Sequence, residues 1–353
     1  MAYRRQEIFV PLHGQAKPTR SQAMKPINLL RLAVLVWAVA FSLNVWSQTV
    51  AQTGQIMWGI NGHPQGTGSG SYVTTDIQQQ LKLVADAGFK SYRIDLYSAD
   101  ANSMQALANV IAAAKAVGVQ VLPILLPPTG STEQESYNTG YAMGLAYARN
   151  FATDIPVWEL GNEESDGMLI DPNGFGIDFS EFDRERYALV RGKLRGLLDG
   201  VNAGSPTAKR MIDGIVCEVG FFKGLWADGV KWDITAWHWY DSSGDITNSG
   251  CNGLNVIGVL HDSFHLPIWI TEFGTYGTDK TAVRNTLIAT MKQWNSIASQ
   301  YDIQAGFIYE LLDQHDEDGI QGEFGIFDSN GNGTAASDAI RGYLKRNPGA
   351  VVH

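Results

Sequence analysis

Cysteines are few in this sequence, charged residues are sparse, and nucleotide-binding motifs are missing. Two cysteines in 353 residues exclude a disulfide-rich mini-scaffold and a four-cysteine zinc site. Charged residues make up 18% of the chain, aromatic residues 10% and hydrophobic residues 44%, which excludes a disordered chain and supplies a large core. No G-x-G-x-x-G follows the first predicted strand and no Walker loop occurs, so nothing supports nucleotide binding.

Basic residues are in deficit. The chain has 26 Lys and Arg against 36 Asp and Glu, a net charge of −10. Six of the basic residues and one acidic residue lie in residues 1–51, so the remainder is more acidic than the whole. Such a body repels nucleic acid phosphates, and we expect no nucleic acid partner.

Residues 1–51 are predicted to be an N-terminal leader with a secretory signal. The segment Leu32–Ser47 is uncharged; its sixteen residues are short for a membrane span and suit the apolar region of a signal. Thr49 and Ala51 follow with the spacing of a signal peptidase site, and Met24 is an alternative start. The sequence therefore predicts a periplasmic or secreted protein.

Two consequences depend on that leader. Export would permit a disulfide between Cys217 and Cys251, because extracytoplasmic compartments are oxidising. The alternative is an uncleaved signal anchor, and beyond such an anchor we expect no membrane partner.

Residues 52–353 show eight short apolar runs, mostly separated by segments of helical period. The predicted helices are Thr75–Ala87, which Gly88 ends, Ser103–Ala116, Thr281–Ser299 and a short one at Phe222–Trp226. This alternation predicts an α/β fold, a single-domain (β/α)₈ TIM barrel, with a doubly wound open sheet as the alternative. The predicted strands are Ile56–Asn61, Lys90–Leu96, Val119–Leu126, Ile155–Gly161, Arg210–Cys217, Trp232–Trp239, Leu266–Glu272 and Gln304–Glu310.

Polar residues collect where these strands end, and a barrel of this type carries its chemistry at that end. Carboxylates, amides and imidazoles at so many strand ends predict an active site there. The residues are Asn61, His63, Arg93, Asp95, Asn162, Glu163, Glu164, His238, Tyr240, Glu272, Glu310 and Asp313.

Two segments carry a resemblance to a known group. Val157–Glu163 (VWELGNE) and Trp269–Gly274 (WITEFG) resemble the fourth- and seventh-strand motifs of glycoside hydrolase clan A, the retaining β-glycosidases on (β/α)₈ barrels. Arg93 resembles the clan's second-strand arginine, His238–Tyr240 its sixth-strand H-x-Y, and Phe324–Asp328 its closing turn. The resemblance covers nearly all of the chain after the leader, and families 5 and 39 look nearest.

The resemblance implies a mechanism with two carboxylates. Glu272 would be the nucleophile and Glu163 the general acid and later the base, with the carboxyl groups about 5–5.5 Å apart. We expect Glu163 to have the higher pKa, raised by an apolar pocket and by the charge of Glu272. Glu164 is a competing candidate for the acid.

The same resemblance implies substrate contacts. Asn162 would bind the sugar 2-hydroxyl, Tyr240 would donate a hydrogen bond to the nucleophile, and Arg93 would lie beneath it. Where the clan has a tryptophan after the eighth strand, either Tyr309 replaces it or Glu310 touches sugar hydroxyls. The remaining predicted substrate-binding residues are His238, Trp239, Asn61 and His63.

Weaker patterns point to no metal or cofactor. His261 and His265 have helical ligand spacing but lack a third ligand, and the loop at Asp328 resembles a tight turn more than a calcium site. We therefore expect an exported retaining hydrolase that cleaves a β-linked oligo- or polysaccharide without a cofactor. The rivals are a polysaccharide-binding pseudoenzyme, a transglycosylase on the same barrel, and a scaffold that binds a protein partner.

Overall fold

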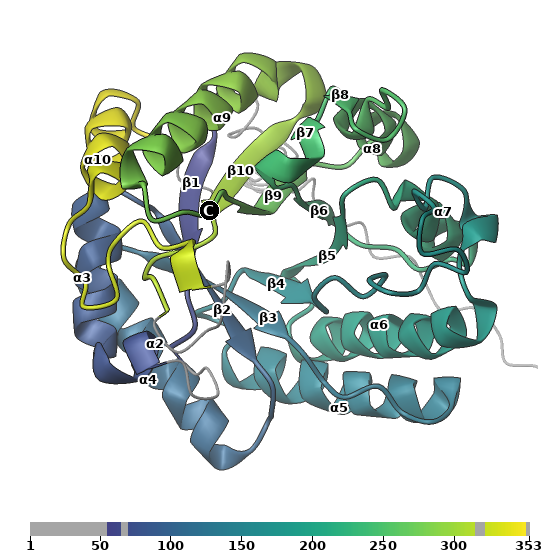
Figure 1. Ribbon diagram of the computed structural model, residues 1–353. Coiled ribbons are helices and arrows are strands. Elements are labelled where there is room, and N and C mark those ends of the chain that lie inside the picture. The colour runs from purple at the N-terminus through teal and green to yellow at the C-terminus, as the bar shows by residue number, and fades with distance from the viewer. Residues whose placement is uncertain (1–54, 65–69, 315–321, 351–353) are drawn as a thin grey trace, which may run out of the picture. The chain divides into compact units, whose positions relative to one another are not determined.

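The computed structural model describes residues 55–64, 70–314 and 322–350, and the predicted leader lies outside them. Eight parallel strands form a closed barrel in the order β1-β10-β9-β6-β5-β4-β3-β2 (Figure 1). Because β1 pairs with both β2 and β10, the barrel prediction is confirmed and the open sheet is wrong. The barrel strands are β1 (Met57–Asn61), β2 (Ser91–Leu96), β3 (Gln120–Leu125), β4 (Val157–Leu160), β5 (Lys209–Ile215), β6 (Ile234–His238), β9 (Ile268–Phe273) and β10 (Ile303–Ile308).

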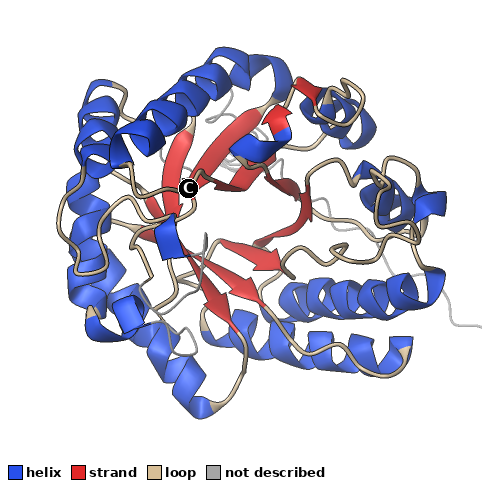
Figure 2. Ribbon diagram, in the orientation of Figure 1, coloured by secondary structure: helices blue, strands red, loops and turns tan. Residues whose placement is uncertain are grey.

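Helices surround this barrel (Figure 2), and a two-stranded hairpin, β7 (Gly244–Asp245) and β8 (Asn248–Ser249), follows β6. None of the described helices is long and apolar enough to cross a bilayer. The α-helices are α2 (Gly70–Thr74), α3 (Ile77–Ala87), α4 (Ala101–Val117), α5 (Glu133–Asn150), α6 (Arg184–Gly204), α7 (Val219–Ala227), α8 (Val256–Phe264), α9 (Lys280–Tyr301) and α10 (Ala335–Arg346).

The ends of α3 show why the predicted helix is shorter in the structure. The side chain of Asp76 accepts a hydrogen bond from the Gln79 amide, which makes Asp76 the N-cap and starts the helix at Ile77. Gly88 ends it in the left-handed region, with φ 97°, where a side chain would be strained.

Alternation along the strands sorts the barrel interior into layers. Met57, Leu122, Val157, Met211 and Trp269 belong to one buried apolar cluster. Successive side chains of a strand face opposite sides, so the residue two positions after an interior apolar residue also points inward. By this rule apolar side chains fill the barrel near the amino ends of its strands, and polar side chains lie near the carboxyl ends.

Helices α5 and α6 lie side by side with their backbones in close approach (Figure 1). Gly192, Gly196, Gly200 and Gly204 recur every fourth residue of α6 and therefore share a face. A Cβ built on Gly196 would lie 2.1 Å from the carbonyl oxygen of Tyr137 in α5. Glycine is required here for space.

We expect Gly196→Ala to lower the free energy of unfolding by about 1–3 kcal/mol, because the added methyl group forces the two helices apart. The matched control is Gly342→Ala in α10, where the new Cβ meets nothing nearer than the flexible end of Arg346 at 3.4 Å. In that control the free energy of unfolding should rise by up to about 1 kcal/mol, because alanine has a higher helix propensity than glycine. Urea denaturation of both variants checks this, and equal effects would contradict the packing argument.

Candidate functional site

A cavity of about 480 Å³ opens at the carboxyl end of the barrel. Of the predicted site residues, the two glutamates Glu163 and Glu272 line it, together with His63, Asn162, Tyr240 and Tyr309. The other predicted substrate-binding residues, Asn61, Arg93, His238, Trp239 and Glu310, are buried and do not line it.

The two glutamates approach each other from different strands. Glu272 lies in β9 with its side chain 9% exposed, while Glu163 follows β4 and is 32% exposed. One carboxylate oxygen of each glutamate and a ring nitrogen of His238 lie within 4.8 Å of one another. This proximity fits the separation at which one carboxylate attacks and the other protonates.

Arg93 fixes the nucleophile candidate from below. Its Nη1 donates to Glu272 Oε1 at 2.5 Å, and its Nε and Nη2 hold Glu159 at 2.6 and 3.1 Å. From the other side, the Tyr240 hydroxyl donates to Glu272 Oε2 at 2.5 Å. Burial raises the pKa of Tyr240, and the charge of Glu272 raises it further, so this hydroxyl keeps its proton.

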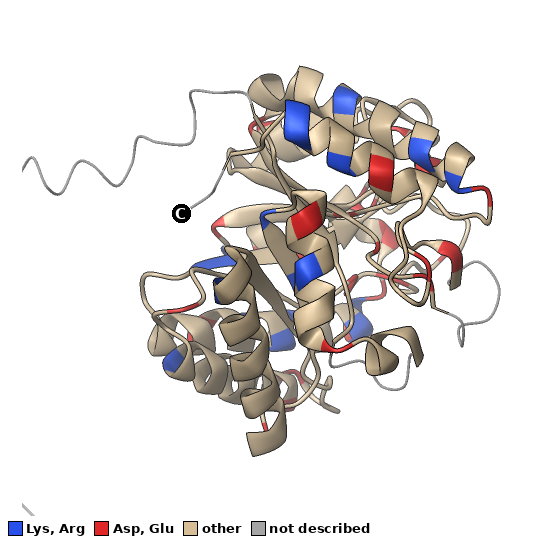
Figure 3. Ribbon diagram, turned by 90° about the vertical axis from the view of Figure 1, so that its left-hand side faces the viewer, with Lys and Arg blue, Asp and Glu red and all other residues tan. Residues whose placement is uncertain are grey.

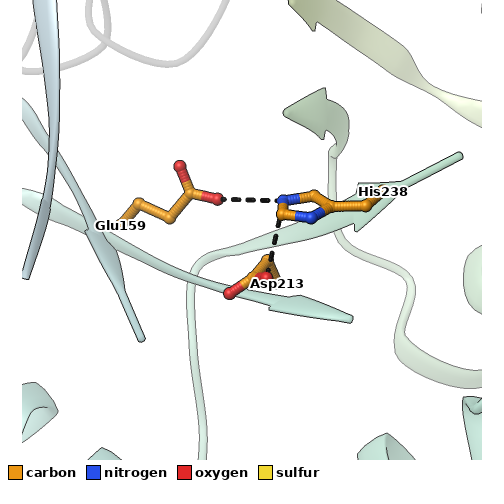
Figure 4. Close-up of side chains that lie close together, drawn as sticks. All are labelled: Glu159, Asp213 and His238. Carbon is orange, nitrogen blue, oxygen red and sulfur yellow. Dashed lines mark ion pairs between the residues drawn. The ribbon is translucent and has the colours of Figure 1, made fainter. Parts of the chain in front are cut away.

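His238 connects the general acid candidate to two buried carboxylates. Its Nδ1 lies 2.8 Å from Glu163 Oε1, while its Nε2 lies 3.4 Å from Asp213 and 3.9 Å from Glu159. Figure 4 shows Glu159 and Asp213 directed at the same edge of the imidazole ring. Burial lowers the pKa of His238, but the charges of Glu272 and Asp213 outweigh it and raise that pKa well above its ordinary value.

This contact corrects the expected pKa of Glu163. Burial raises the pKa of Glu163, as expected, but the hydrogen bond and charge of His238 and the charge of Arg93 bring it below its ordinary value. The sequence predicts an apolar pocket around Glu163, whereas the structure places the ring of His238 beside its carboxylate. These opposite pKa shifts favour the proton on His238 over Glu163 in the free protein.

Asp213 is a site residue that sequence reasoning missed. Glu163 has a left-handed backbone, with φ 50°, which is strained for a residue with a side chain. Its amide donates to Asp213 Oδ2 at 2.7 Å. Asp213 therefore holds both the backbone of Glu163 and the ring of His238. The signal available in the sequence was an aspartate inside an otherwise apolar run, Met211–Ile215.

Asp213 also predicts a pH dependence of stability. Burial raises the pKa of Asp213 to about 7, against the opposing charge of His238, whereas an unfolded aspartate titrates near pH 4. Between about pH 4 and 7 the folded chain holds a proton that the unfolded chain has released, so Asp213 lowers stability as the pH rises through this window.

Asp213→Asn keeps the acceptor for Glu163 but removes this titration. Between pH 4.5 and 7.5, we expect the free energy of unfolding of the wild type to fall by a few kcal/mol relative to that of the variant. Urea denaturation at both pH values gives the double difference in the free energy of unfolding, in which titrating groups that do not interact with Asp213 cancel. Parallel changes in the two proteins would contradict the assignment.

The structure separates the two candidates after β10. The carboxylate of Glu310 is buried and bonded on both oxygens, accepting from the Tyr72 hydroxyl and from Gln314 Nε2, each at 2.8 Å. Tyr309 precedes it, faces the other way and lines the cavity. Of the two candidates, Tyr309 therefore lines the cavity, whereas the Glu310 carboxylate is buried and already bonded on both oxygens.

Two further expectations, for Trp239 and Asn61, are corrected by burial. Trp239 lies between the inward His238 and Tyr240 and so points away from the barrel axis; its Nε1 donates to the Gly244 carbonyl. Asn61 accepts from Arg93 and donates to the Thr271 carbonyl, so it supports the arginine. Arg93 contacts Glu272 from below, as expected, and does not itself line the cavity.

The competing acid and the weaker patterns take structural roles. Glu164 pairs with Lys193 at 2.6 Å, and both side chains are buried, so that of these two neighbours only Glu163 lines the cavity. His261 contacts its neighbour Asp262 at 2.8 Å. Asp328 accepts from the amides of Asn330 and Asn332, which is the hydrogen bonding of a tight turn.

Beside the cavity, a disulfide joins Cys217 to Cys251, the pairing that export would permit. It connects the loop after β5, where Val216 lines the cavity wall, to the segment after β8. Both sulfurs belong to buried residues.

Replacing both cysteines by alanine should lower the free energy of unfolding by about 3–4 kcal/mol, because the bond closes a loop of 34 residues in the unfolded chain. Urea denaturation with and without a reductant measures this. The reductant should destabilise the wild type and leave the double variant unchanged; an equal response would contradict the prediction.

One protein family and several solved structures are similar to this chain. The family described as "Glycosyl hydrolase catalytic core" matches residues 216–337, which contain His238, Tyr240 and Glu272. No curated protein matches the chain in sequence.

Three solved structures illustrate the shared fold. A family 39 glycoside hydrolase from Bacteroides cellulosilyticus WH2 aligns at TM-score 0.62 and 17% identity, over 83% of this chain and 65% of that one. The family 1 β-glucosidase of Thermotoga maritima aligns at 0.62 and 12%, over 84% and 98%. A family 5 enzyme from Streptomyces cattleya in complex with Manβ1-4GlcNAc aligns at 0.58 and 15%, over 82% and 80%.

These identities are low, so the likeness to solved structures shows the fold, while the family match adds the catalytic core. The matched segment supports a glycosyl hydrolase catalytic core, and the solved structures show the (β/α)₈ barrel that enzymes of families 1, 5 and 39 share.

Proposed function

We propose that this protein is an exported retaining β-glycoside hydrolase that cleaves a β-linked oligo- or polysaccharide by double displacement. The observation that carries the proposal is the pair of glutamates in one cavity, with carboxylate oxygens within 4.8 Å of each other. Glu272 is held from both sides by Arg93 and Tyr240, whereas Glu163 is the more exposed of the two.

In the first step, an oxygen of Glu272 attacks the anomeric carbon, and the bond from that carbon to the leaving oxygen breaks. The hydrogen bonds from Arg93 and Tyr240 keep Glu272 ionised and oriented. Glu163 transfers a proton to the leaving oxygen, so the first product departs as an alcohol and a glycosyl ester remains on Glu272.

The proton for this transfer comes from the pair formed by Glu163 and His238. Two groups that share a proton over 2.8 Å titrate as one unit. A sugar that fills the cavity removes water from Glu163 and disfavours its charged form, which moves the proton from His238 Nδ1 to Glu163 Oε1.

In the second step, Glu163 is ionised and acts as a base. It takes a proton from a water molecule, whose oxygen attacks the anomeric carbon while the ester bond to Glu272 breaks. Two inversions at one carbon give net retention, and both carboxyl groups return to their initial state.

Export rests on the leader predicted from residues 1–51 and is supported by the disulfide between Cys217 and Cys251, which suits an oxidising compartment. We propose the periplasm or the exterior as its location, and a carbohydrate as its partner.

Proton NMR of the anomeric signals tests this function. During hydrolysis of a panel of 4-nitrophenyl β-glycosides, the sugar released first should be the β-anomer, which then equilibrates. Initial release of the α-anomer would contradict retention. Glycosyl transfer with little free sugar would favour the transglycosylase, and no turnover of any glycoside would favour the pseudoenzyme.

A further inference from the structure

We propose that the sugar residues held in this cavity are uncharged: they carry no carboxylate, sulfate or phosphate group. This inference rests on the proposed function and names the substrate class of the same site. It follows from the charges that line the cavity and from the way in which each nearby cation is already paired.

The cavity wall is acidic. Among the described residues that line it there are four carboxylates, Asp95, Glu163, Asp241 and Glu272, and no Lys or Arg. The two internal segments that lie outside the described residues, 65–69 and 315–321, contain no Lys or Arg in their sequence. Lys and Arg of the described chain lie chiefly on the outer helices (Figure 3).

Arg93 lies directly below the cavity, but its guanidinium has no free donor. Its five N–H groups are directed to the oxygens of Glu159, Glu272, Asn61 and Asn162. The side chain is 2% exposed. An incoming anion would have to displace one of these partners and leave a buried polar group unpaired, which is costly.

The two histidines nearest the cavity, His63 and His238, already lie against carboxylates. Burial lowers the pKa of His63, but the charge of Asp95 raises it to well above its ordinary value. This imidazolium lies 2.6 Å from Asp95 and 3.4 Å from Glu310. His238 is likewise surrounded by Glu159, Asp213 and Glu163. Both rings therefore meet at least as many carboxylates as they can neutralise.

What remains on the wall suits a neutral sugar. Tyr97 and Tyr276 are 52% and 45% exposed, and Tyr240, Tyr309 and Phe324 complete an aromatic lining. Ring faces pack against the C–H groups of pyranoses, and phenol hydroxyls exchange hydrogen bonds with sugar hydroxyls. An anionic group would meet like charges at short range in a partly desolvated space, which lowers affinity by orders of magnitude.

The experiment separates binding from cleavage. Glu163→Gln removes the acid and keeps the cavity shape, and affinity electrophoresis measures its retardation by soluble polymers. Hydroxyethyl cellulose and carboxymethyl cellulose form one matched pair; neutral β-mannan and mixed-linkage β-glucan are compared with alginate and polygalacturonate. Hydrolysis of the same polymers by the wild type is followed from reducing ends.

We expect retardation by at least one neutral polymer and at least tenfold weaker retardation by every anionic one. Binding to an anionic polymer as tight as to the neutral ones overturns the inference, and so does failure to bind any neutral polymer. Binding of a neutral polymer that the wild type does not cleave would leave the substrate class standing and contradict the hydrolase.

A gain of binding provides the second test. Ser242 lines the cavity and is exposed, so Ser242→Lys adds the missing cation there. Ser299→Lys adds the same charge at an exposed position of α9, away from the cavity. Both variants are made in the Glu163→Gln background. Several-fold stronger binding of the anionic polymers by the Ser242→Lys protein supports the inference; equal binding by the two contradicts it.

Discussion

Replacing Glu272 by alanine is expected to lower kcat by about 10⁴-fold or more, because it removes the group that forms the covalent intermediate. The loss should be similar for substrates with good and poor leaving groups, since no nucleophile remains for either. Arg93 loses one partner of its guanidinium in this variant, so circular dichroism must show that the protein is folded. Steady-state hydrolysis of 4-nitrophenyl β-glycosides measures the effect.

Azide provides the matching rescue. In Glu272→Ala the vacated space can admit azide on the face from which the carboxylate attacked, and a single displacement would give the α-glycosyl azide. Glu185→Gln, an exposed glutamate of α6, serves as the control and should retain wild-type kcat. A Glu272→Ala protein with activity within tenfold of the wild type would contradict the assignment.

Replacing Glu163 by alanine should produce a loss that depends on the leaving group. For poor leaving groups, such as a second sugar, kcat/KM should fall by about 10²- to 10⁴-fold, which is the usual contribution of a general acid. For 2,4-dinitrophenyl glycosides, which depart without a proton, the first step should be nearly unchanged. The second step should be slow, so the covalent intermediate accumulates and the product appears in a burst.

Azide distinguishes this variant from the first. Here it should attack the glycosyl ester in place of water and give the β-glycosyl azide, the opposite anomer to that of Glu272→Ala. Glu164→Gln tests the rival acid and should not show this dependence on the leaving group, because Glu164 pairs with Lys193 away from the cavity. The α-anomer from Glu163→Ala would reverse the two assignments.

The strands were predictable because parallel strands covered by helices are apolar on both faces. β2 and β3 begin and end within a residue of the expected ranges. Helices α5 and α6 were not identified, because their contact face is built from glycines such as Gly196 rather than from apolar side chains at helical spacing. Hydrophobic periodicity cannot detect a contact made by the backbone.

The site was predictable to the extent that it lies at strand ends. Glu163 and Glu272 share the cavity because parallel strands place their carboxyl ends together. Asp213 escaped notice because it lies within its strand, below the rim, where apolar residues dominate. The pKa of Glu163 was predicted in the wrong direction because the position of the His238 ring depends on the packing of three strands, which no single segment encodes.

Trapping of the intermediate tests the central claim most directly. The wild type, and separately Glu272→Gln, would be incubated with 2-deoxy-2-fluoro glycosyl fluorides of several sugars and weighed intact by mass spectrometry. We expect an increase by one fluorosugar, mapped by peptide sequencing to Glu272 and absent from Glu272→Gln. An adduct mapped to Glu163 or to any other carboxylate would contradict the account.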